Sequence, residues 1–280
     1  MKYCIVCQGS EFTSYWGGLS ICANCGHCQA NLDVMSLDFQ QIYSENYFKG
    51  EEYLDYLNDR DVFEKQFQDR LKEIRHWQPG GCLIEVGCAF GFFLAAAKPY
   101  FAARGFDIAE EPVRHAREQL GVNAEWGDFV SANIASNSVD VVTLWDTIEH
   151  LANPDRVLEH VSRVLRPGGF VFLTTGDISS LLARLQREHW RLIHPPTHLH
   201  YFTPLTIQRL LNRFGIDVVQ VRHVGTRRSI RQIAYSLFAL EKKSSRLYKW
   251  IERSPFATWS FVLNSFDIML VVGRKQCQKK

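Results

Sequence analysis

The stretch that decides the fold is Leu83-Ile-Glu-Val-Gly-Cys-Ala-Phe-Gly-Phe92. A short apolar run carries one carboxylate, Glu85, and ends in a turn of small residues. An apolar segment compatible with a helix follows over 92–97. This order predicts a buried parallel strand, a tight turn and the start of a helix, the arrangement in which α/β proteins bind nucleotides. Gly87 and Gly91 lack a Cβ, so the backbone there can approach a ligand closely.

The residues around this turn indicate which ligand it holds. A second short strand is expected over 101–106, and it ends in Asp107, which can accept hydrogen bonds from ribose hydroxyls. A dinucleotide is disfavoured because the bulky Phe92 stands where that fingerprint needs a third small residue, and a Gly-Lys-Ser/Thr phosphate loop is missing. Glu85 would repel phosphates but suits a ligand with an ammonium group and no phosphate, which describes S-adenosylmethionine.

The turn resembles the first motif of the class I S-adenosylmethionine-dependent methyltransferases, an acidic residue followed by Gly-x-Gly-x-Gly. Glu85, Gly87, Ala89 and Gly91 stand in those places, and Ala89 departs mildly from the motif. Further segments typical of the family follow in order, and the resemblance covers residues 80–223. These segments are Val122 to Phe129, Asp140 to Leu151, and Leu-Arg-Pro-Gly-Gly at 165–169, where a helix should stop before a strand over Phe170 to Thr174.

The resemblance implies a Rossmann-like α/β fold, with a seven-stranded methyltransferase sheet over residues 80–280 and a helical insertion at 224–262. It implies S-adenosylmethionine as the cofactor, with Glu85 near its ammonium group, Asp107 on the ribose, and Asp128 with the following residue at the adenine. The expected cofactor contacts are Glu85, Gly87, Ala89, Gly91, Asp107, Ile108, Asp128, Phe129 and Trp145.

Five of the eight cysteines lie in the first 28 residues. Their spacing is that of a zinc ribbon, in which two Cys-x-x-Cys turns point four thiolates at one ion. The expected ligands are Cys4, Cys7, Cys22 and Cys25. Four thiolates close a tetrahedral shell, so this zinc would be structural. The sequence predicts a small zinc ribbon over residues 1–30, with disulfide or redox chemistry as the alternative.

Residues 31–79 are expected to form a linker and a lid helix. A charged helix is predicted over 55–77, with an apolar stripe at Phe63, Phe67, Leu71, Ile74 and Trp77. Tyr43, Tyr47 and Phe48 are candidate lid contacts over the cofactor. Packing of these aromatic side chains between the ribbon and the core is the alternative.

A histidine-rich segment, His189 to Thr203, follows the fifth expected strand. Pro195-Pro196 interrupts it, so we expect a loop, and loops at this edge of an open parallel sheet surround the ligand site. Histidine titrates near neutrality and can take a proton from a hydroxyl as a methyl group is transferred. His150, His198 and His200 are therefore the candidate catalytic bases, with structural hydrogen bonding as the alternative for each.

A catalytic divalent metal is a further alternative. Asp146, Glu149 and His150 stand where the quinone O-methyltransferases, a related group, place acidic residues and histidine near an ion. Their spacing would put the three side chains on one helical face.

Composition sets limits on location and partners. The chain has 280 residues, 46% of them hydrophobic, and 32 basic against 30 acidic side chains, so its bulk charge indicates no nucleic-acid partner. No apolar span approaches the ~20 residues of a membrane helix and no secretory signal is visible, so we expect a cytoplasmic protein. The basic insertion at 226–253 could contact a membrane peripherally, dock on a partner, bind a phosphate-bearing substrate, or simply pack with a solvated face.

Two functions compete. The first is S-adenosylmethionine-dependent methyl transfer to a small polar acceptor, such as a sugar or related metabolite hydroxyl, with a histidine base; similar family members are encoded with polysaccharide or natural-product genes. The second is a zinc-ribbon RNA methyltransferase. The second is disfavoured because Lys2 is the only Lys or Arg of residues 1–30. A scaffold with an inactive core is a third hypothesis, against which the Glu85, Gly87, Gly91 and Asp107 set argues.

Overall fold

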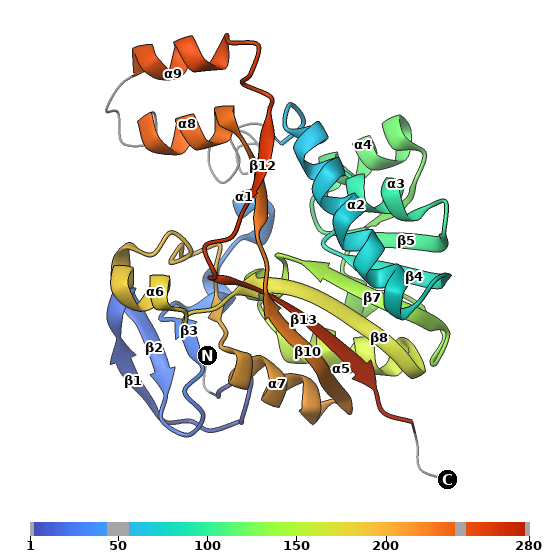
Figure 1. Ribbon diagram of the computed structural model, residues 1–280. Coiled ribbons are helices and arrows are strands. Elements are labelled where there is room, and N and C mark those ends of the chain that lie inside the picture. The colour runs from blue at the N-terminus through green and yellow to red at the C-terminus, as the bar shows by residue number, and fades with distance from the viewer. Residues whose placement is uncertain (1–2, 44–55, 239–244, 278–280) are drawn as a thin grey trace.

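A seven-stranded sheet forms the centre of the computed structural model, which describes residues 3–43, 56–238 and 245–277. The strand order is β10-β13-β8-β7-β4-β5-β6, and β13 runs antiparallel to both of its neighbours (Figure 1). The predicted Rossmann-like seven-stranded sheet is therefore confirmed. Its strands are β4 (Gly81–Val86), β5 (Phe101–Asp107), β6 (Asn123–Trp126), β7 (Val139–Trp145), β8 (Leu165–Gly176), β10 (Ile216–His223) and β13 (Ile268–Lys275).

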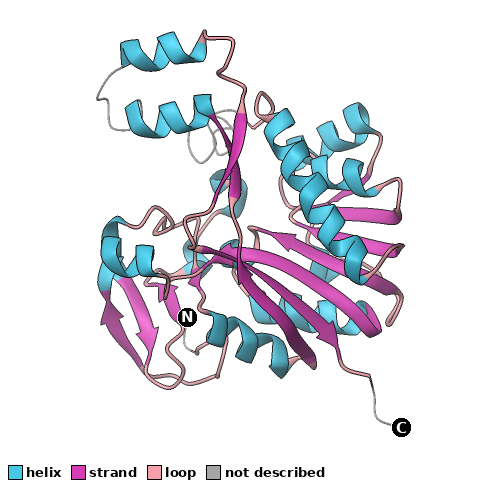
Figure 2. Ribbon diagram, viewed as in Figure 1, coloured by secondary structure: helices cyan, strands magenta, loops and turns pink. Residues whose placement is uncertain are grey.

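Helices cover both faces of this sheet, as Figure 2 shows. Side chains alternate along each buried strand, so Val142 and Leu144 face one core while Val141 and Trp145 face the other. The first core is covered by α5 (Pro154–Val164) and α7 (Pro204–Arg213), and the second by α2 (Arg60–Trp77) and α3 (Phe92–Ala97), with α4 (Glu110–Leu120) beside α3. The helix predicted over 55–77 is thus observed from Arg60, and its stripe residues Phe67, Leu71 and Ile74 are buried as expected.

Local chemistry explains where the helices begin. Gly91 starts α3 in a left-handed conformation (φ +77°), which a side chain would strain, and a Cβ there would lie 2.8 Å from Cβ of Ala116. Pro154 occupies the first turn of α5, where a missing N–H costs nothing. Thr203 and Thr206 form the capping box that begins α7. Short helices complete the chain: α1 (Phe39–Ile42), α6 (Leu181–Gln186), η1 (Trp16–Gly18), η2 (Val34–Ser36), η4 (Phe129–Ser131), η5 (Ile148–His150) and η6 (Arg187–His189).

The fifth expected strand is longer than predicted. Instead of starting at Phe170, β8 starts at Leu165 and includes the Arg-Pro-Gly-Gly segment that should have separated helix from strand. The reason is an early pairing of Leu165 with Val139, followed by a register shift before Val141 pairs with Phe170. The helix α5 does end before this segment, as expected.

The N-terminal strands do not form an isolated unit. β1 (Phe12–Tyr15), β2 (Leu19–Cys22) and β3 (Cys28–Ala30) form an antiparallel sheet whose fourth strand is β9 (His200–Tyr201). The histidine-rich segment is therefore a loop, as predicted, but its end is a short strand that pairs with the N-terminal sheet. Arg213 of α7 also donates hydrogen bonds to the carbonyl oxygens of Ile5 and Val6, which fixes the first Cys-x-x-Cys turn to the core.

The insertion protrudes from the sheet at the top of Figure 1. It contains two helices, α8 (Ile230–Phe238) and α9 (Ser245–Glu252), as the expected helical insertion requires. A two-stranded stalk that the sequence did not predict carries them, formed by β11 (Thr226–Ser229) and β12 (Ser260–Leu263). No helix within the described residues is both long and apolar enough to span a membrane.

Candidate cofactor and active site

A cavity of about 610 Å³ opens at the carboxyl ends of β4, β5, β6 and β7. Seven of the expected cofactor contacts line it: Gly87, Ala89, Asp107, Ile108, Asp128, Phe129 and Trp145. The other two, Glu85 and Gly91, do not line the cavity. Gly91 packs α3 against α4, and its role among the described residues is to let those helices approach.

Two carboxylates lie at the cavity wall: Asp107 is partly buried and lines the cavity, whereas Glu85 is buried and does not line it. Asp107 accepts hydrogen bonds from the backbone N–H groups of Ala89 (2.8 Å) and Ala109 (2.9 Å), which hold the Gly87 turn against the end of β5. Glu85 is fully enclosed, and its Oε2 accepts no hydrogen bond from any described residue. Burial, and then the charge of Asp107, raise the pKa of Glu85, while Arg70 opposes this rise. Burial raises the pKa of Asp107 as well. Such a pair would be stabilised by a bound cation.

The Gly87 turn packs closely against Thr147. Gly87 has φ +78°, and a Cβ there would lie 2.6 Å from Oγ1 of Thr147, which follows β7. Thr147 is held in turn because its hydroxyl donates to the carbonyl oxygen of Trp145. The first turn and the end of β7 therefore approach closely, and only glycine permits that contact.

The far end of the cavity has the features of an adenine site. Asp128 caps η4 through a hydrogen bond from the Val130 amide (3.0 Å), and the next side chain, Phe129, is buried. Trp126 lines the same end, and its indole N–H donates to the carbonyl oxygen of Ile108 (3.0 Å). An exposed Trp ring and an Ile side chain offer flat apolar surface beside a carboxylate, which suits an aminopurine.

The N-terminal segments close the cavity from one side. Arg70 of α2 lies 3.2 Å from Oδ2 of Asp146, and its guanidinium stacks over the Trp145 ring at 4.7 Å from the centroid. Phe39 and Tyr43 also line the cavity, so Tyr43 lies where a lid contact was expected. The other two expected lid residues, Tyr47 and Phe48, lie outside the described residues.

The three candidate bases occupy different surroundings. His150 lines the cavity, and its Nδ1 lies 2.9 Å from the carbonyl oxygen of Thr197. A carbonyl can only accept, so this nitrogen carries the proton and the lone pair resides on Nε2. Burial lowers the pKa of His150 to about 4, and the imidazole is therefore neutral well below pH 7. If His150 is the base, the pH-rate profile should therefore lose activity only at a pH well below neutrality, where the imidazole becomes protonated.

His198 and His200 lie farther from the cavity wall. The His198 ring stands perpendicular to that of His150, with centroids 4.6 Å apart, and its Nδ1 lies 2.9 Å from the Leu192 carbonyl oxygen. His200 is fully buried, and its Nδ1 is 3.2 Å from Nε2 of His27 in the N-terminal sheet. Of the three, only His150 lines the cavity in the described part of the chain.

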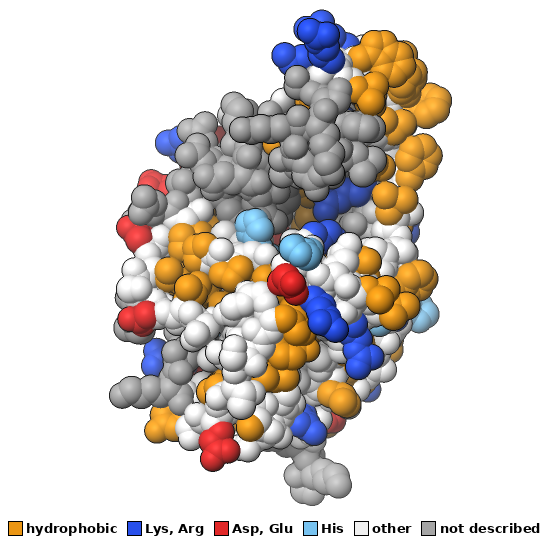
Figure 3. All heavy atoms as spheres, turned by 90° about the vertical axis from the view of Figure 1, so that its left-hand side faces the viewer, with side chains coloured by type: hydrophobic (Ala, Val, Ile, Leu, Met, Phe, Trp, Pro, Cys, Tyr) orange, Lys and Arg blue, Asp and Glu red, His pale blue; other side chains and the backbone are white. Residues whose placement is uncertain are grey.

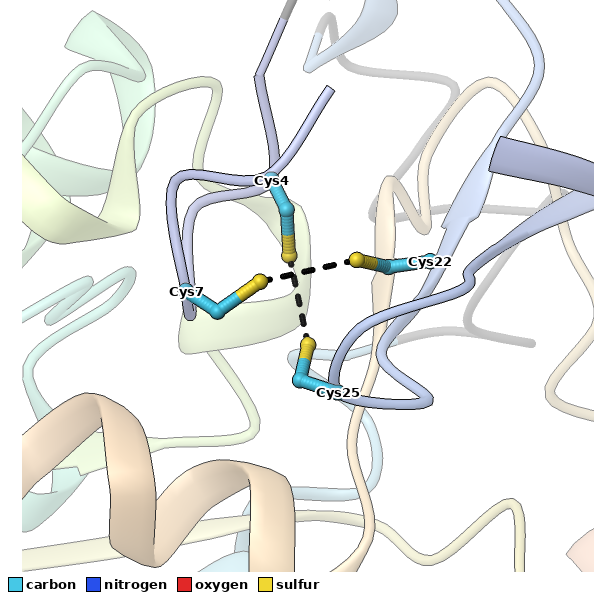
Figure 4. Close-up of side chains that lie close together, drawn as sticks. All are labelled: Cys4, Cys7, Cys22 and Cys25. Atoms are coloured by element: carbon cyan, nitrogen blue, oxygen red, sulfur yellow. Dashed lines mark hydrogen bonds between the residues drawn. The ribbon is translucent and has the colours of Figure 1, made fainter. Parts of the chain in front are cut away.

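Among the described residues, two groups of side chains could hold a metal ion. Glu149, His150 and His198 offer ligand atoms within 4.8 Å of one another, whereas the acid at 146 that the sequence suggested is paired with Arg70 instead. The second group is Cys4, Cys7, Cys22 and Cys25, whose sulfur atoms point toward one centre in Figure 4.

The cysteine geometry fits zinc. Sγ of Cys4 lies 3.5 Å from that of Cys25, and Sγ of Cys7 lies 3.5 Å from that of Cys22, and none of them forms a disulfide. A tetrahedral ion with bonds of about 2.3 Å sets sulfur atoms about 3.8 Å apart. Cys28, the remaining cysteine of this region, is buried and is not part of the group.

Several residues in the cavity wall or in contact with it were not predicted from the sequence. Arg70 occupies a polar position of an amphipathic helix, and nothing in its spacing distinguishes it from a solvated residue. Trp126 lies two positions before Asp128, the acid expected at the adenine, and that proximity could have identified it. Thr147 and Arg156 also line the cavity.

Known proteins match the part of the chain that holds most of the cavity residues. Residues 58–221 match the family model described as "Methyltransferase domain". The ubiquinone biosynthesis O-methyltransferase of Cupriavidus pinatubonensis is 27% identical over 157 residues, which are 51% of this chain and 63% of that protein. The malonyl-[acyl-carrier protein] O-methyltransferase of Methylococcus capsulatus is 30% identical over 187 residues, covering 63% of this chain and 66% of that protein. The match thus spans a little under two thirds of each relative's length.

Solved structures agree on the fold. A SAM-dependent methyltransferase from Archaeoglobus fulgidus superposes with a TM-score of 0.54 at 16% identity, covering 79% of this chain and 99% of that one. Identity at that level supports the fold and does not extend to the substrate.

Proposed function

Because the chain belongs to the methyltransferase domain family, we propose that it transfers a methyl group from S-adenosylmethionine to a hydroxyl of a small polar acceptor, such as a sugar or a related metabolite. The observation that carries the cofactor assignment is the charge of the cavity. Its lining includes three carboxylates, Asp107, Asp128 and Asp146, against one guanidinium, Arg156, among the described residues, so acidic groups are in excess even though Arg70 pairs with Asp146.

This charge discriminates between adenosine cofactors. A dinucleotide brings a pyrophosphate, which needs positive charge or several free backbone amides. S-adenosylmethionine brings an ammonium and a sulfonium and no phosphate. The unpaired oxygen of Glu85 and the raised pKa values of Glu85 and Asp107 support a cationic ligand beside them.

The chain's own residues have separable roles in this proposal. Asp107 has acceptor capacity left for ribose hydroxyls, since each oxygen takes one backbone amide. Asp128 and Phe129 would hold the adenine. Bound S-adenosylmethionine supplies an electrophilic methyl group, so the protein mainly aligns the acceptor and removes one proton.

His150 is the residue we assign to that proton. It lines the cavity beside Asp146 and Thr147, and its neutral imidazole presents a lone pair on Nε2. His198 supports the His150 ring edge-on, and His200 supports the N-terminal sheet. Oxygen is the favoured acceptor atom because both curated relatives are named as O-methyltransferases.

We also propose a structural zinc ion on Cys4, Cys7, Cys22 and Cys25. The convergence of four cysteine sulfur atoms supports it, because four thiolates complete a tetrahedral zinc shell. This ion would have no open coordination position and no part in methyl transfer.

Replacing Asp107 by Asn should weaken binding of S-adenosylmethionine at least about tenfold, because charge-assisted hydrogen bonds to ribose contribute roughly 1.5–3 kcal/mol each. Asn retains the shape and one acceptor oxygen for the Gly87 turn. Titration calorimetry measures the change, and Glu118→Ala, an exposed acid on α4, is the matched control. Equal affinities in wild type and Asp107→Asn, or tight binding of NAD, would refute the cofactor assignment.

Replacing His150 by Ala should reduce methyl transfer by about 10²–10⁴-fold while cofactor affinity changes little. The acceptor is first identified by a labelled-methyl screen over nucleotide sugars, other hydroxylated metabolites and RNA. His189→Ala, an exposed histidine outside the cavity, should keep full activity. Full activity in His150→Ala would exclude this base, and labelling of RNA alone would exclude the small-molecule acceptor.

One equivalent of zinc should co-purify with the protein and be lost in Cys22→Ser but kept in Cys277→Ser, whose thiol is exposed and remote from the quartet in sequence. The β3–β9 pairing that joins the N-terminal strands to the histidine-rich loop is short. Loss of zinc should therefore make residues 1–30 sensitive to protease before the core unfolds. Elemental analysis of anaerobically prepared protein checks the metal, and a metal-free preparation with an intact N-terminal sheet would show that no ion is needed.

A further inference from the structure

The outer end of the insertion carries a surface that methyl transfer does not use. We define it as the distal surface: Arg246, Lys249, Trp250, Arg253, Pro255, Phe256 and Trp259. Arg246 is three and four positions before Lys249 and Trp250, so these three share one face of α9, and Arg253 follows directly after the helix ends at Glu252. The opposite face of α9 turns inward, where the Tyr248 ring packs against Tyr235 of α8 with centroids 5.6 Å apart.

The distal surface carries three positive charges that no acid of the described residues pairs with. Arg246, Lys249 and Arg253 are exposed, and none of them forms an ion pair with a described residue. The acid of α9, Glu252, is bonded instead by the Tyr248 hydroxyl at 2.8 Å. Other cations of the insertion behave differently: Arg227 pairs with Asp69, and Arg231 pairs with Asp59, so these two fix the stalk to the protein.

Large aromatic side chains lie exposed among these cations. Trp250 is 64% exposed and Trp259 is 63% exposed, and the Trp250 ring contacts that of Phe256 with centroids 6.4 Å apart. The apolar surface continues along β12, where Phe261, Val262 and Leu263 are also exposed. Figure 3 shows hydrophobic side chains along one edge of the protruding end, with Lys and Arg side chains at its top.

Cations and aromatics enclose a shallow hollow in this surface. Its lining is Arg246, Lys249, Trp250, Arg253, Ser254, Pro255 and Phe256, which includes three positive charges and no carboxylate. An anionic headgroup would meet complementary charge there, and Trp and Phe rings beside it would reach the boundary between headgroups and acyl chains. Lys and Arg can keep their charges at the headgroups while their stems lie on apolar surface.

We propose that the distal surface binds the face of an anionic lipid bilayer. Stable peripheral binding takes two contributions, apolar insertion and attraction to anionic lipid, and the distal surface supplies both at the end of a protruding stalk. A protein partner would not require unpaired cations around a headgroup-sized hollow. This inference goes beyond methyl transfer and does not depend on it.

The test is co-sedimentation of the full chain with vesicles. Wild type should bind vesicles of phosphatidylglycerol and phosphatidylcholine, bind pure phosphatidylcholine weakly, and dissociate from the mixed vesicles as salt rises. The triple variant Arg246→Glu, Lys249→Glu, Arg253→Glu should bind the mixed vesicles about 100-fold or more weakly, since each basic residue near such a surface contributes a factor of roughly five. The double variant Trp250→Ala, Phe256→Ala should also lose binding, and its loss should persist at low salt.

The matched control is Arg114→Glu, Arg117→Glu, which reverses two exposed charges on α4. It should bind as wild type does. Equal thermal midpoints for all variants establish that the surface and not the fold has changed. The proposal is overturned if wild type does not prefer anionic vesicles, if the triple variant binds them equally well, or if sedimentation shows that the distal surface instead joins two copies of the chain.

Discussion

The structure depends on two carboxylates that end adjacent parallel strands inside the protein. Glu85 on β4 is buried and Asp107 at the end of β5 is partly buried, and a charge removed from water is costly unless it is paired or hydrogen-bonded. Asp107 accepts hydrogen bonds from two backbone amides, one of which belongs to the glycine turn. These bonds fix the turn to the end of β5. Arg70 is the cation that acts on Glu85, and it comes from α2, which covers the sheet. A cationic cofactor would offset the negative charge of Glu85 and Asp107 that Arg70 and the two amides leave unbalanced.

The histidine-rich loop is the second part of the site that the fold holds in place. His150 is held by the Thr197 carbonyl, and Leu199 donates its N–H to the Glu149 carbonyl, so the loop lies directly against the turn after β7. The same loop ends in β9, which completes the N-terminal sheet. The cysteine quartet therefore lies beside the sheet that supports the loop, with Cys22 in β2, and an ion there would stabilise the loop indirectly, through backbone pairing.

The central sheet could be predicted from the sequence because its signals are local. The Glu85 to Gly91 turn, the acids at strand ends, the proline that begins α5 and the capping box of α7 each act within a few positions. The β3–β9 pairing could not be predicted, since it joins residues about 170 positions apart through two residues of strand. The same holds for Arg70, which resembles any polar helix residue, and for β11, whose Thr-Arg-Arg-Ser sequence shows no alternation. Spacing likewise could not show that His150 lines the cavity while His200 is enclosed.

The most direct test of the central claim is a crystal structure of the protein with S-adenosylhomocysteine. We expect the ribose on Asp107, the adenine between Ile108 and Phe129 near Asp128, and the amino group on the side of Glu85 and Arg70. A nucleoside bound elsewhere on the protein, or a ligand in this cavity that makes no contact with Asp107, would contradict the account.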